Sequence, residues 1–97
     1  PGVLDYVDLG ADYNLAEIEA KGDFIGKSIR ELHLKSKYCV NIIMIMKKIK
    51  ETAGEEGEFT EREIKELPTP DYVLGKKDIL VVVGDSKDIE DLEKHIK

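Results

Sequence analysis

The chain has 97 residues, 41% of them hydrophobic and 37% charged, with a net charge of −6 and a pI near 4.9. This composition favours one globular domain over a disordered chain. The acidic balance argues against nucleic acid as a partner, because binding phosphates requires a basic face. No apolar run approaches the ~18 residues of a membrane span, so we expect no direct membrane insertion. A single cysteine, Cys39, excludes an internal disulfide and favours a reducing compartment.

The first third of the sequence predicts one strand and one helix. Residues 1–14 lack a clear period and are predicted to be a lead-in from a preceding domain. Residues 15–20 alternate apolar and acidic side chains, which is typical of a short strand. A short amphipathic helix is predicted over about residues 27–33, with Ile29 and Leu32 facing the core. The basic Lys-Ser-Lys run that follows is expected to close this helix as a turn.

The most apolar segment, residues 39–46, predicts a strand with two apolar faces. Strict alternation places Val40, Ile42, Met44 and Met46 on one face and Asn41, Ile43 and Ile45 on the other. A strand of this kind must be covered on both faces. A small domain can cover one face with its own helices, so we expect a partner subunit to cover the second. The segment is therefore predicted to serve both as core and as the interface of a homodimer.

A charged insertion over residues 50–66 carries seven glutamates between positions 51 and 66. We predict that residues 51–63 are solvated and mobile, or only marginally helical, because few apolar side chains anchor them. Residues 64–67 are expected to form a short edge strand, since Pro68 and Pro70 cannot donate to a central ladder.

The last third predicts a buried strand and a closing helix. Residues 79–83, ILVVV, are five consecutive strand formers and are predicted to form a central strand. Ser86 is predicted to cap the closing helix, whose Ile89, Leu92 and Ile96 share one face. In chain order the elements read β-α-β-β-β-α. The sequence therefore predicts an α+β domain with a small mixed β-sheet and two helices.

Groups that could perform catalysis do not come together in the sequence. His33 and His95 lie far apart, with no cysteine or carboxylate at metal-ligand spacing. The sequence also lacks a Walker A loop, a G-x-S-x-G elbow, an H-E-x-x-H pair and the dinucleotide glycine fingerprint. We therefore predict a binding or regulatory module, not an enzyme, with no metal and no cofactor in this fragment.

Five segments in order carry a family resemblance: GKSIREL, LKSKYCVNIIMI, Pro68-Thr69-Pro70, LGKKDILVVVGD and DIEDLEKHI. Together they resemble the C-terminal domain of the regulator-of-potassium-conductance family (RCK-C, also called TrkA-C), found in gating subunits of Trk and Ktr potassium transporters. The resemblance covers about residues 3–97. It implies a TrkA C-terminal domain-like fold over residues 15–97, while the opening GVLDYVDLGADY resembles the join to an N-terminal Rossmann domain (RCK-N) that is missing here.

The resemblance implies a regulatory, ligand-binding and dimerisation domain of a cytosolic subunit that controls potassium transport. Its expected partners are a second copy and a membrane potassium transporter or channel subunit. Its expected location is cytoplasmic, at the inner face of the membrane through that transport partner. In some relatives the C-terminal dimer interface binds the second messenger cyclic di-AMP, which makes this molecule the possible ligand here.

The positions that the resemblance assigns to this ligand are Ile29, Lys35, Val40, Asn41, Ile42 and Pro68. Apolar side chains and a proline suit an adenine ring, Asn41 can both donate and accept at a base edge, and Lys35 can face a phosphate. Lys35 stands where the family commonly has arginine, and Cys39 stands where it commonly has glycine.

Two alternatives from other classes remain open. The domain could serve assembly alone, holding two subunits together without a ligand, which a ligand-dependent shift in melting temperature would exclude. It could also be an amino-acid sensor of the ACT type, which would need a glycine-rich loop between its first strand and helix. Residues 21–26 are a poor version of that loop.

Overall fold

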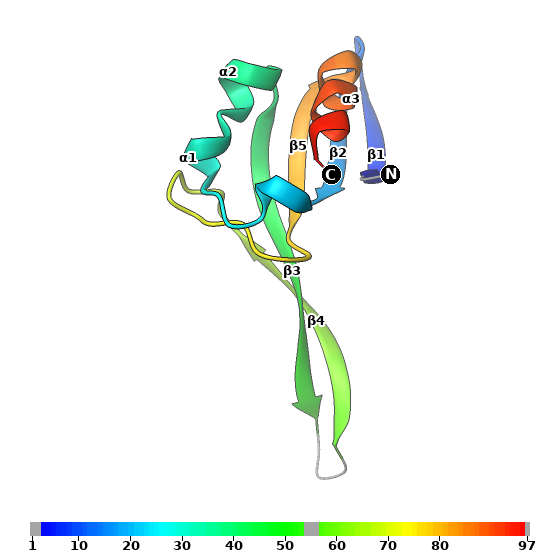
Figure 1. Ribbon diagram of the computed structural model, residues 1–97. Helices are drawn as coiled ribbons and strands as arrows, with labels where there is room; N and C mark the ends of the chain where they lie inside the picture. The colour runs from blue at the N-terminus through cyan, green and yellow to red at the C-terminus, as the bar shows by residue number, and fades with distance from the viewer. Residues whose placement is uncertain (1–2, 54–56, 97) are drawn as a thin grey trace.

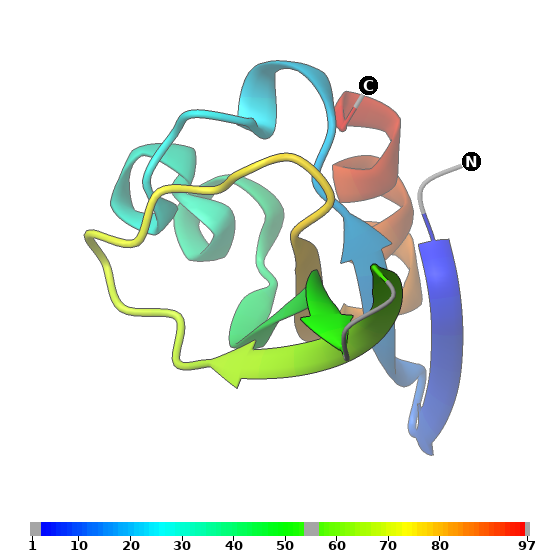
Figure 2. The same ribbon diagram turned by 90° about the horizontal axis from the view of Figure 1, so that it is seen from below.

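The computed structural model describes residues 3–53 and 57–96, which form one five-stranded sheet with its helices on one side (Figures 1 and 2). The elements are β1 (Val3–Gly10), β2 (Tyr13–Glu19), the 3₁₀ turn η1 (Gly22–Phe24), α1 (Ile29–Leu32), α2 (Leu34–Tyr38), β3 (Asn41–Ala53), β4 (Glu58–Glu66), β5 (Ile79–Asp85) and α3 (Ser86–His95). The strand order is β1-β2-β5-β3-β4. The α+β class is confirmed. All four described strand pairings are antiparallel. The prediction of a mixed sheet is therefore wrong.

The N-terminal segment forms a strand that the sequence did not predict. Val3–Gly10 pairs with β2 at one edge of the sheet, with Tyr6 opposite Ala16. The role of residues 1–14 as a lead-in from a preceding domain stays a prediction. Seven of the eight residues of β1 are exposed, and an edge strand with two wet faces leaves no periodic signal in the sequence. The Rossmann domain expected before this segment stays a prediction.

The predicted helix over 27–33 is two short helices that meet at His33. This residue adopts left-handed backbone angles (φ 49°, ψ 44°), which end α1 and let α2 begin in a new direction. The Lys-Ser-Lys run predicted as a turn lies within α2. Leu32 and Leu34 are both buried, and Ile29 packs against the same core, so the two helices present one apolar side to the sheet.

A β-bulge interrupts the alternation predicted for β3. The pairing of β3 with β5 shifts register between Ile42 and Met44. Ile42 and Ile45 therefore lie on the helix-covered face, whereas Met44 and Met46 lie on the other face. The predicted phase is wrong beyond Ile42, although the strand is apolar on both faces as expected.

Three residues on the face away from the helices are buried by neighbouring side chains of the sheet. Met46 is 8% exposed, and Ile79 and Val81 are each 6% exposed, with Leu15 and Met44 packed against them. A partner subunit is therefore not needed to bury this cluster. The homodimer itself remains a prediction.

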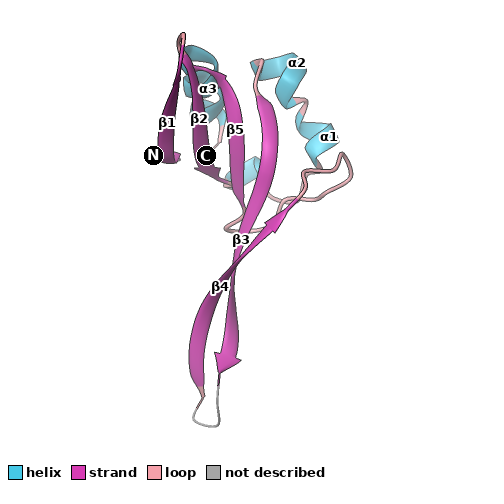
Figure 3. Ribbon diagram, turned by 180° about the vertical axis from the view of Figure 1, so that it is seen from behind, coloured by secondary structure: helices cyan, strands magenta, loops and turns pink. Residues whose placement is uncertain are grey.

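The charged insertion is an ordered β-hairpin over the residues that the structure describes. β3 continues to Ala53 and pairs with β4 from Ile45–Glu66 out to Ala53–Glu58, which corrects the prediction of a mobile or helical segment (Figure 3). Lys48 faces Glu63 and Lys50 faces Glu61 across the strands, and opposite charges in facing pairs stabilise such a ribbon. Residues 54–56 of this segment lie outside the described residues. The edge strand expected over 64–67 is confirmed, and it is longer than predicted.

We call residues 47–53 and 58–64 the hairpin arm. β5 pairs with β3 only as far as Met46, so the arm extends beyond the body of the domain (Figure 1). The longest dimension of the molecule is 50 Å, against 28 and 23 Å in the other two directions.

The C-terminal half of the sheet and α3 form the core as predicted. β5 is the central strand, and Ile89, Leu92 and Ile96 of the closing helix are buried against it. The cap differs from the prediction: the Asp85 carboxylate accepts from the Lys87 amide at 2.9 Å. Ser86 is instead the first helical residue, and its hydroxyl donates to the Asp12 carbonyl at 3.2 Å.

No helix in the described part of the chain is long and apolar enough to cross a membrane.

Candidate functional site

A pocket of about 670 Å³ lies between the two short helices, the start of β3 and the loop after β4. Its walls are Ile29 and Arg30 of α1, His33 at the junction, Leu34, Lys35 and Ser36 of α2, Val40, Asn41 and Ile42, and Pro70. The floor is apolar, whereas Arg30, His33, Lys35 and Asn41 are exposed at the rim. A shallow apolar floor with a few polar groups around it suits a flat organic ligand that carries negative charge.

Five of the six predicted ligand residues line this one pocket. Ile29, Lys35, Val40, Asn41 and Ile42 come from three separate segments, and the fold brings them together. Pro68, the sixth residue, does not line the pocket: it lies half-buried in the loop after β4. Pro70, two residues further on, occupies the wall instead. The roles of these residues toward a ligand stay predictions.

A capping box fixes the helix that carries Ile29. The Ser28 hydroxyl accepts from the Glu31 amide at 3.1 Å, and the Glu31 carboxylate accepts from the Ser28 amide at 3.0 Å. The hydrogen bond from the Ser28 amide lowers the pKa of Glu31, because it favours the charged carboxylate, and the Ser28 side chain acts in the same direction.

The loop after β4 is tied to the start of the same helix. The Ile29 amide donates to the Tyr72 carbonyl at 2.9 Å, and the Arg30 amide donates to the Pro70 carbonyl at 2.9 Å. These bonds satisfy two of the amides that a helix start leaves free. They also hold Pro70 against the pocket.

A buried carboxylate anchors the other end of this loop. Asp78 is only 3% exposed, and it accepts from the Tyr72 hydroxyl at 2.9 Å and from the Gly75 amide at 2.8 Å. Lys47, at the base of the hairpin arm, lies 5.0 Å from the centre of the Tyr72 ring. Contact with Tyr72 raises the pKa of Lys47, and burial raises the pKa of Tyr72. The buried position of Asp78 was not predicted, since an aspartate in a turn is usually solvated.

The cationic rim of the pocket is not fully paired within the described residues. Arg30 forms an ion pair with Asp71 at 3.4 Å, and both side chains are largely exposed. The ion pairs and side-chain hydrogen bonds found in residues 3–53 and 57–96 do not involve Lys35 or the Asn41 side chain. Both groups are therefore available to a ligand.

Sequence reasoning missed half of the pocket wall: Arg30, His33, Leu34, Ser36 and Pro70. Arg30 is exposed at the rim of the pocket. His33 was missed because its left-handed backbone has no sequence signal apart from the residue type. The described residues include no group of three or more side chains that could hold a metal ion.

Comparison with known proteins identifies the family. The model of the TrkA-C domain matches residues 15–97. The chain is 30% identical over 94 residues to the Ktr system potassium uptake protein C of Bacillus subtilis (strain 168), covering 97% of this chain and 37% of that protein. It is 31% identical over 91 residues to the Ktr system potassium uptake protein A of the same organism, covering 94% of this chain and 35% of that protein. The chain thus spans little more than a third of the length of these relatives.

Two solved structures share the fold. The RCK domain of GsuK superposes with a TM-score of 0.67 at 25% identity, covering 98% of this chain and 18% of the other. The RCK C domain of the potassium transport protein KtrA, solved in complex with cyclic diadenosine monophosphate (c-di-AMP), superposes with a TM-score of 0.62 at 28% identity. That match covers 88% of this chain and 85% of the other. The matched family model and both structures agree with the sheet and helices described above, and the chain belongs to the TrkA-C domain family.

Proposed function

We propose that this chain is the regulatory, ligand-sensing domain of a cytoplasmic subunit of a Ktr-type potassium uptake system. In this proposal the pocket binds cyclic di-AMP, and a second copy of the chain completes the site across a two-fold axis. The domain acts through its binding equilibrium and has no catalytic role. Its other partner is a membrane potassium transporter or channel subunit, contacted through the whole protein.

One observation carries the proposal: residues from α1, α2 and β3 that were assigned to this ligand line a single pocket. Ile29 and Ile42 give the floor flat apolar surface for an adenine ring. Asn41 is exposed at the rim, where its amide can both donate to and accept from a base edge. Lys35 supplies a positive charge for a phosphate.

The KtrA structure supports the choice of ligand, since that related domain was solved with c-di-AMP bound. The two-fold symmetry of the ligand supports the choice of assembly. An isologous dimer presents the same residues twice around its axis, and each half of a symmetric dinucleotide can then meet the same side chains. The rim of the pocket is exposed in the single chain, so a second copy has room to close it.

Titration calorimetry with cyclic di-AMP tests the proposal. We expect one ligand per two chains. Asn41→Ala removes a base-edge partner and should weaken binding by about 1–3 kcal/mol, which is roughly 5- to 150-fold.

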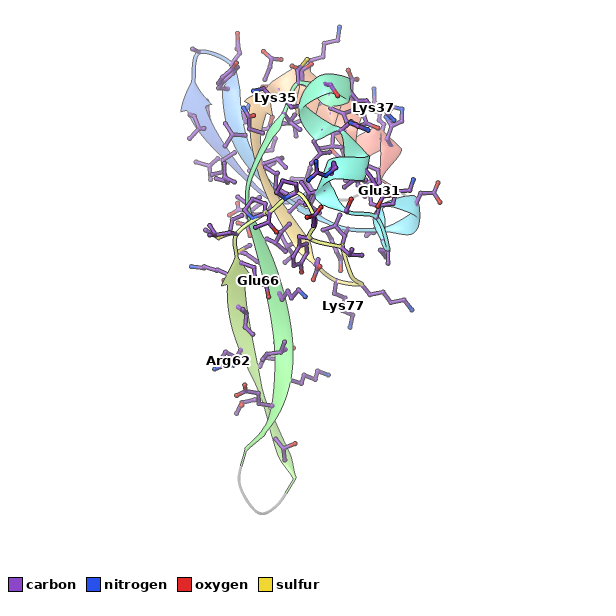
Figure 4. The ribbon with its side chains drawn as sticks, turned by 90° about the vertical axis from the view of Figure 1, so that its left-hand side faces the viewer. Glu31, Lys35, Lys37, Arg62, Glu66 and Lys77 are labelled. Atoms are coloured by element: carbon purple, nitrogen blue, oxygen red, sulfur yellow. The ribbon has the colours of Figure 1, made fainter. Side chains whose placement is uncertain are left out.

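Lys35→Ala should weaken binding more at low salt than at high salt, because salt screens the charge that it removes. Lys37→Ala is the matched control. It removes an equal charge from the same helix, but Lys37 lines a different groove, beside Tyr38 and His95, and lies apart from Lys35 (Figure 4). Equal losses for the two lysine variants would mean that the ligand senses only the net charge of the domain.

The dimer is tested separately by sedimentation of the chain with and without ligand. Ile42→Asp should weaken dimerisation and binding together, because Ile42 lies in the pocket floor. Dimers without any heat or melting shift from cyclic di-AMP would leave assembly alone as the function. A ligand-free monomer that binds one ligand per chain would contradict the two-fold site.

A further inference from the structure

The outer edge of β4 has no strand beside it, because β4 is the last strand of the sheet. Such an edge offers a row of free backbone donors and acceptors that another chain can pair with. Arg62 lies along the arm and Glu66 lies near its base (Figure 4). The described backbone hydrogen bonds outside the sheet do not involve Arg62–Glu66.

Over residues 61–66 the charge order favours one register of pairing with a second copy. A second copy would pair with this edge antiparallel, across a two-fold axis. Residues that lie opposite each other must point to the same face of the sheet, so one residue at the axis faces its own copy. Centring the pair on Ile64 places Glu63 opposite Lys65, and Arg62 opposite Glu66. Ile64, which is half-buried, then meets its own copy. Every charged side chain of this segment faces an opposite charge.

The other registers centred within residues 61–66 oppose like charges. Centring on Arg62 faces Arg62 with itself and Glu61 with Glu63. Centring on Glu61, Glu63 or Lys65 faces that residue with its own copy. Like charges directly opposite each other destabilise a strand pair. Among the registers centred on residues 61–65, only the one at Ile64 avoids such a pair.

The free edge of β3 in the arm cannot pair with itself in this way. Beyond Met46 this edge has lost its neighbour β5 and is equally open. Registers centred on Lys47, Lys48 or Lys50 face a lysine with itself, and the register centred on Ile49 faces Lys48 with Lys50. The two open edges of the arm therefore differ: registers centred on residues 47–50 of β3 oppose lysines, whereas the register centred on Ile64 of β4 opposes only unlike charges.

We propose that the β4 edge over Arg62–Glu66 is a docking surface for a second copy of this chain, which pairs antiparallel around Ile64 and joins two sheets into one. Pro68 lacks an amide hydrogen and limits the pairing on one side. This contact is separate from the pocket and does not depend on the proposed ligand. A chain with two different isologous contacts assembles beyond a dimer, so both surfaces together would produce tetramers or longer assemblies.

Engineered disulfides test the register directly. In a Cys39→Ser background, Ile64→Cys places two thiols across the axis with Cα atoms about 4.5–5.5 Å apart, which a disulfide can span. Arg62→Cys is the matched control. Residue 62 lies two positions from the axis on each strand, so the Cα atoms of its two copies are about 13 Å apart. We expect oxidation to cross-link the residue-64 variant and not the residue-62 variant. Equal cross-linking at both positions, or none at either, would overturn the proposal.

A charge exchange provides a second test that does not touch Ile64. Lys65→Glu and Glu63→Lys each oppose like charges across the axis, so each variant alone should lose this contact. In an equal mixture, one variant carries glutamate at positions 63 and 65 and the other carries lysine at both. Each glutamate then faces a lysine across the axis, and we expect mixed dimers in native mass spectrometry. Lys76→Glu, in an exposed turn before β5, controls for the change in net charge. Association that is unchanged by either single variant, or no mixed species, would refute the β4 contact whatever the ligand experiments give.

Discussion

Gly84→Ala tests how tightly the central strand packs against the pocket wall. Gly84 is buried in β5, opposite Asn14 of β2. A Cβ atom at this position would lie 2.9 Å from Cγ1, 3.4 Å from Cβ and 3.5 Å from Cα of Val40. Carbon atoms normally stay 3.5–4.0 Å apart, so Val40 would have to move. Val40 is 0% exposed, so its own neighbours would have to move with it.

The expected loss of stability follows from two opposing effects. Overpacking of a well-filled core costs about 1–3 kcal/mol. Replacing glycine by alanine returns about 0.4–1 kcal/mol, because it restricts the unfolded chain. Gly84 does not have a positive φ, so no backbone strain adds to the balance. We expect the free energy of unfolding to fall by roughly 1–2 kcal/mol, or about 4–15 °C in melting temperature for a domain of this size.

Urea denaturation of a double-mutant cycle isolates the contact. Val40→Ala alone should cost about 2 kcal/mol through lost burial and a small cavity. The methyl group added at residue 84 partly fills that cavity. The double variant should therefore lose about 1 kcal/mol less stability than the two single losses added together. Protein concentration must be held constant, since association shifts the apparent stability.

Gly75→Ala is the matched control for the same chemical change. Its Cβ would lie 3.7 Å from the Asp78 carboxylate, which is an ordinary contact, and it should change the stability by less than about 0.5 kcal/mol. If Gly84→Ala unfolds at the wild-type midpoint, or if its effect and that of Val40→Ala simply add, the packing argument is wrong.

Further variants test three single features. Cys39 has left-handed backbone angles (φ 57°) after α2, so Cys39→Gly should stabilise the fold by about 0.5–1 kcal/mol in urea denaturation, while Lys37→Gly inside the helix should destabilise it. Asp78→Ala leaves the partly buried Tyr72 hydroxyl without its acceptor and should cost about 1–3 kcal/mol; a melting temperature within a degree or two of wild type would contradict the anchor. The pKa of Glu17 is raised, first by burial and then by neighbouring carboxylates, so its contribution to stability is full below its ordinary pKa near 4.5 and is lost as the pH rises through the folded pKa. Glu17→Gln should therefore stabilise the domain at pH 7 by less than about 1 kcal/mol, since Glu17 is only half-buried, and a gain that persists at pH 3 would argue against this cause.

Local sequence patterns were sufficient where one physical signal dominated. Residues 79–83 are a run of strand formers, and they form the central strand because a fully buried position tolerates no polar side chain. Ile89 and Leu92 share a helical face, and both are buried for the same reason. The family pattern likewise predicted half of the residues that line the pocket, although Pro70 occupies the wall in place of Pro68.

The hairpin arm shows where composition misled. Glutamates and lysines in residues 50–66 indicate solvation, and each strand alone lacks the apolar anchors of an ordered element. Pairing changes this outcome, because Lys48 and Lys50 face Glu63 and Glu61 across the ribbon. A register of this kind exists only once two distant segments lie side by side.

The sequence by itself determined the α+β class, the central strand, the closing helix and the family, because each depends on local periodicity or on motifs in order. Only the tertiary structure decided the edge strand β1, the bulge after Ile42, the junction at His33 and the carboxylate of Asp78 buried beneath the loop. These features depend on which segments become neighbours. Backbone hydrogen bonds at a sheet edge, a left-handed residue between helices and a buried polar group are stable only when distant partners satisfy them, and single-chain periodicity carries no record of those partners.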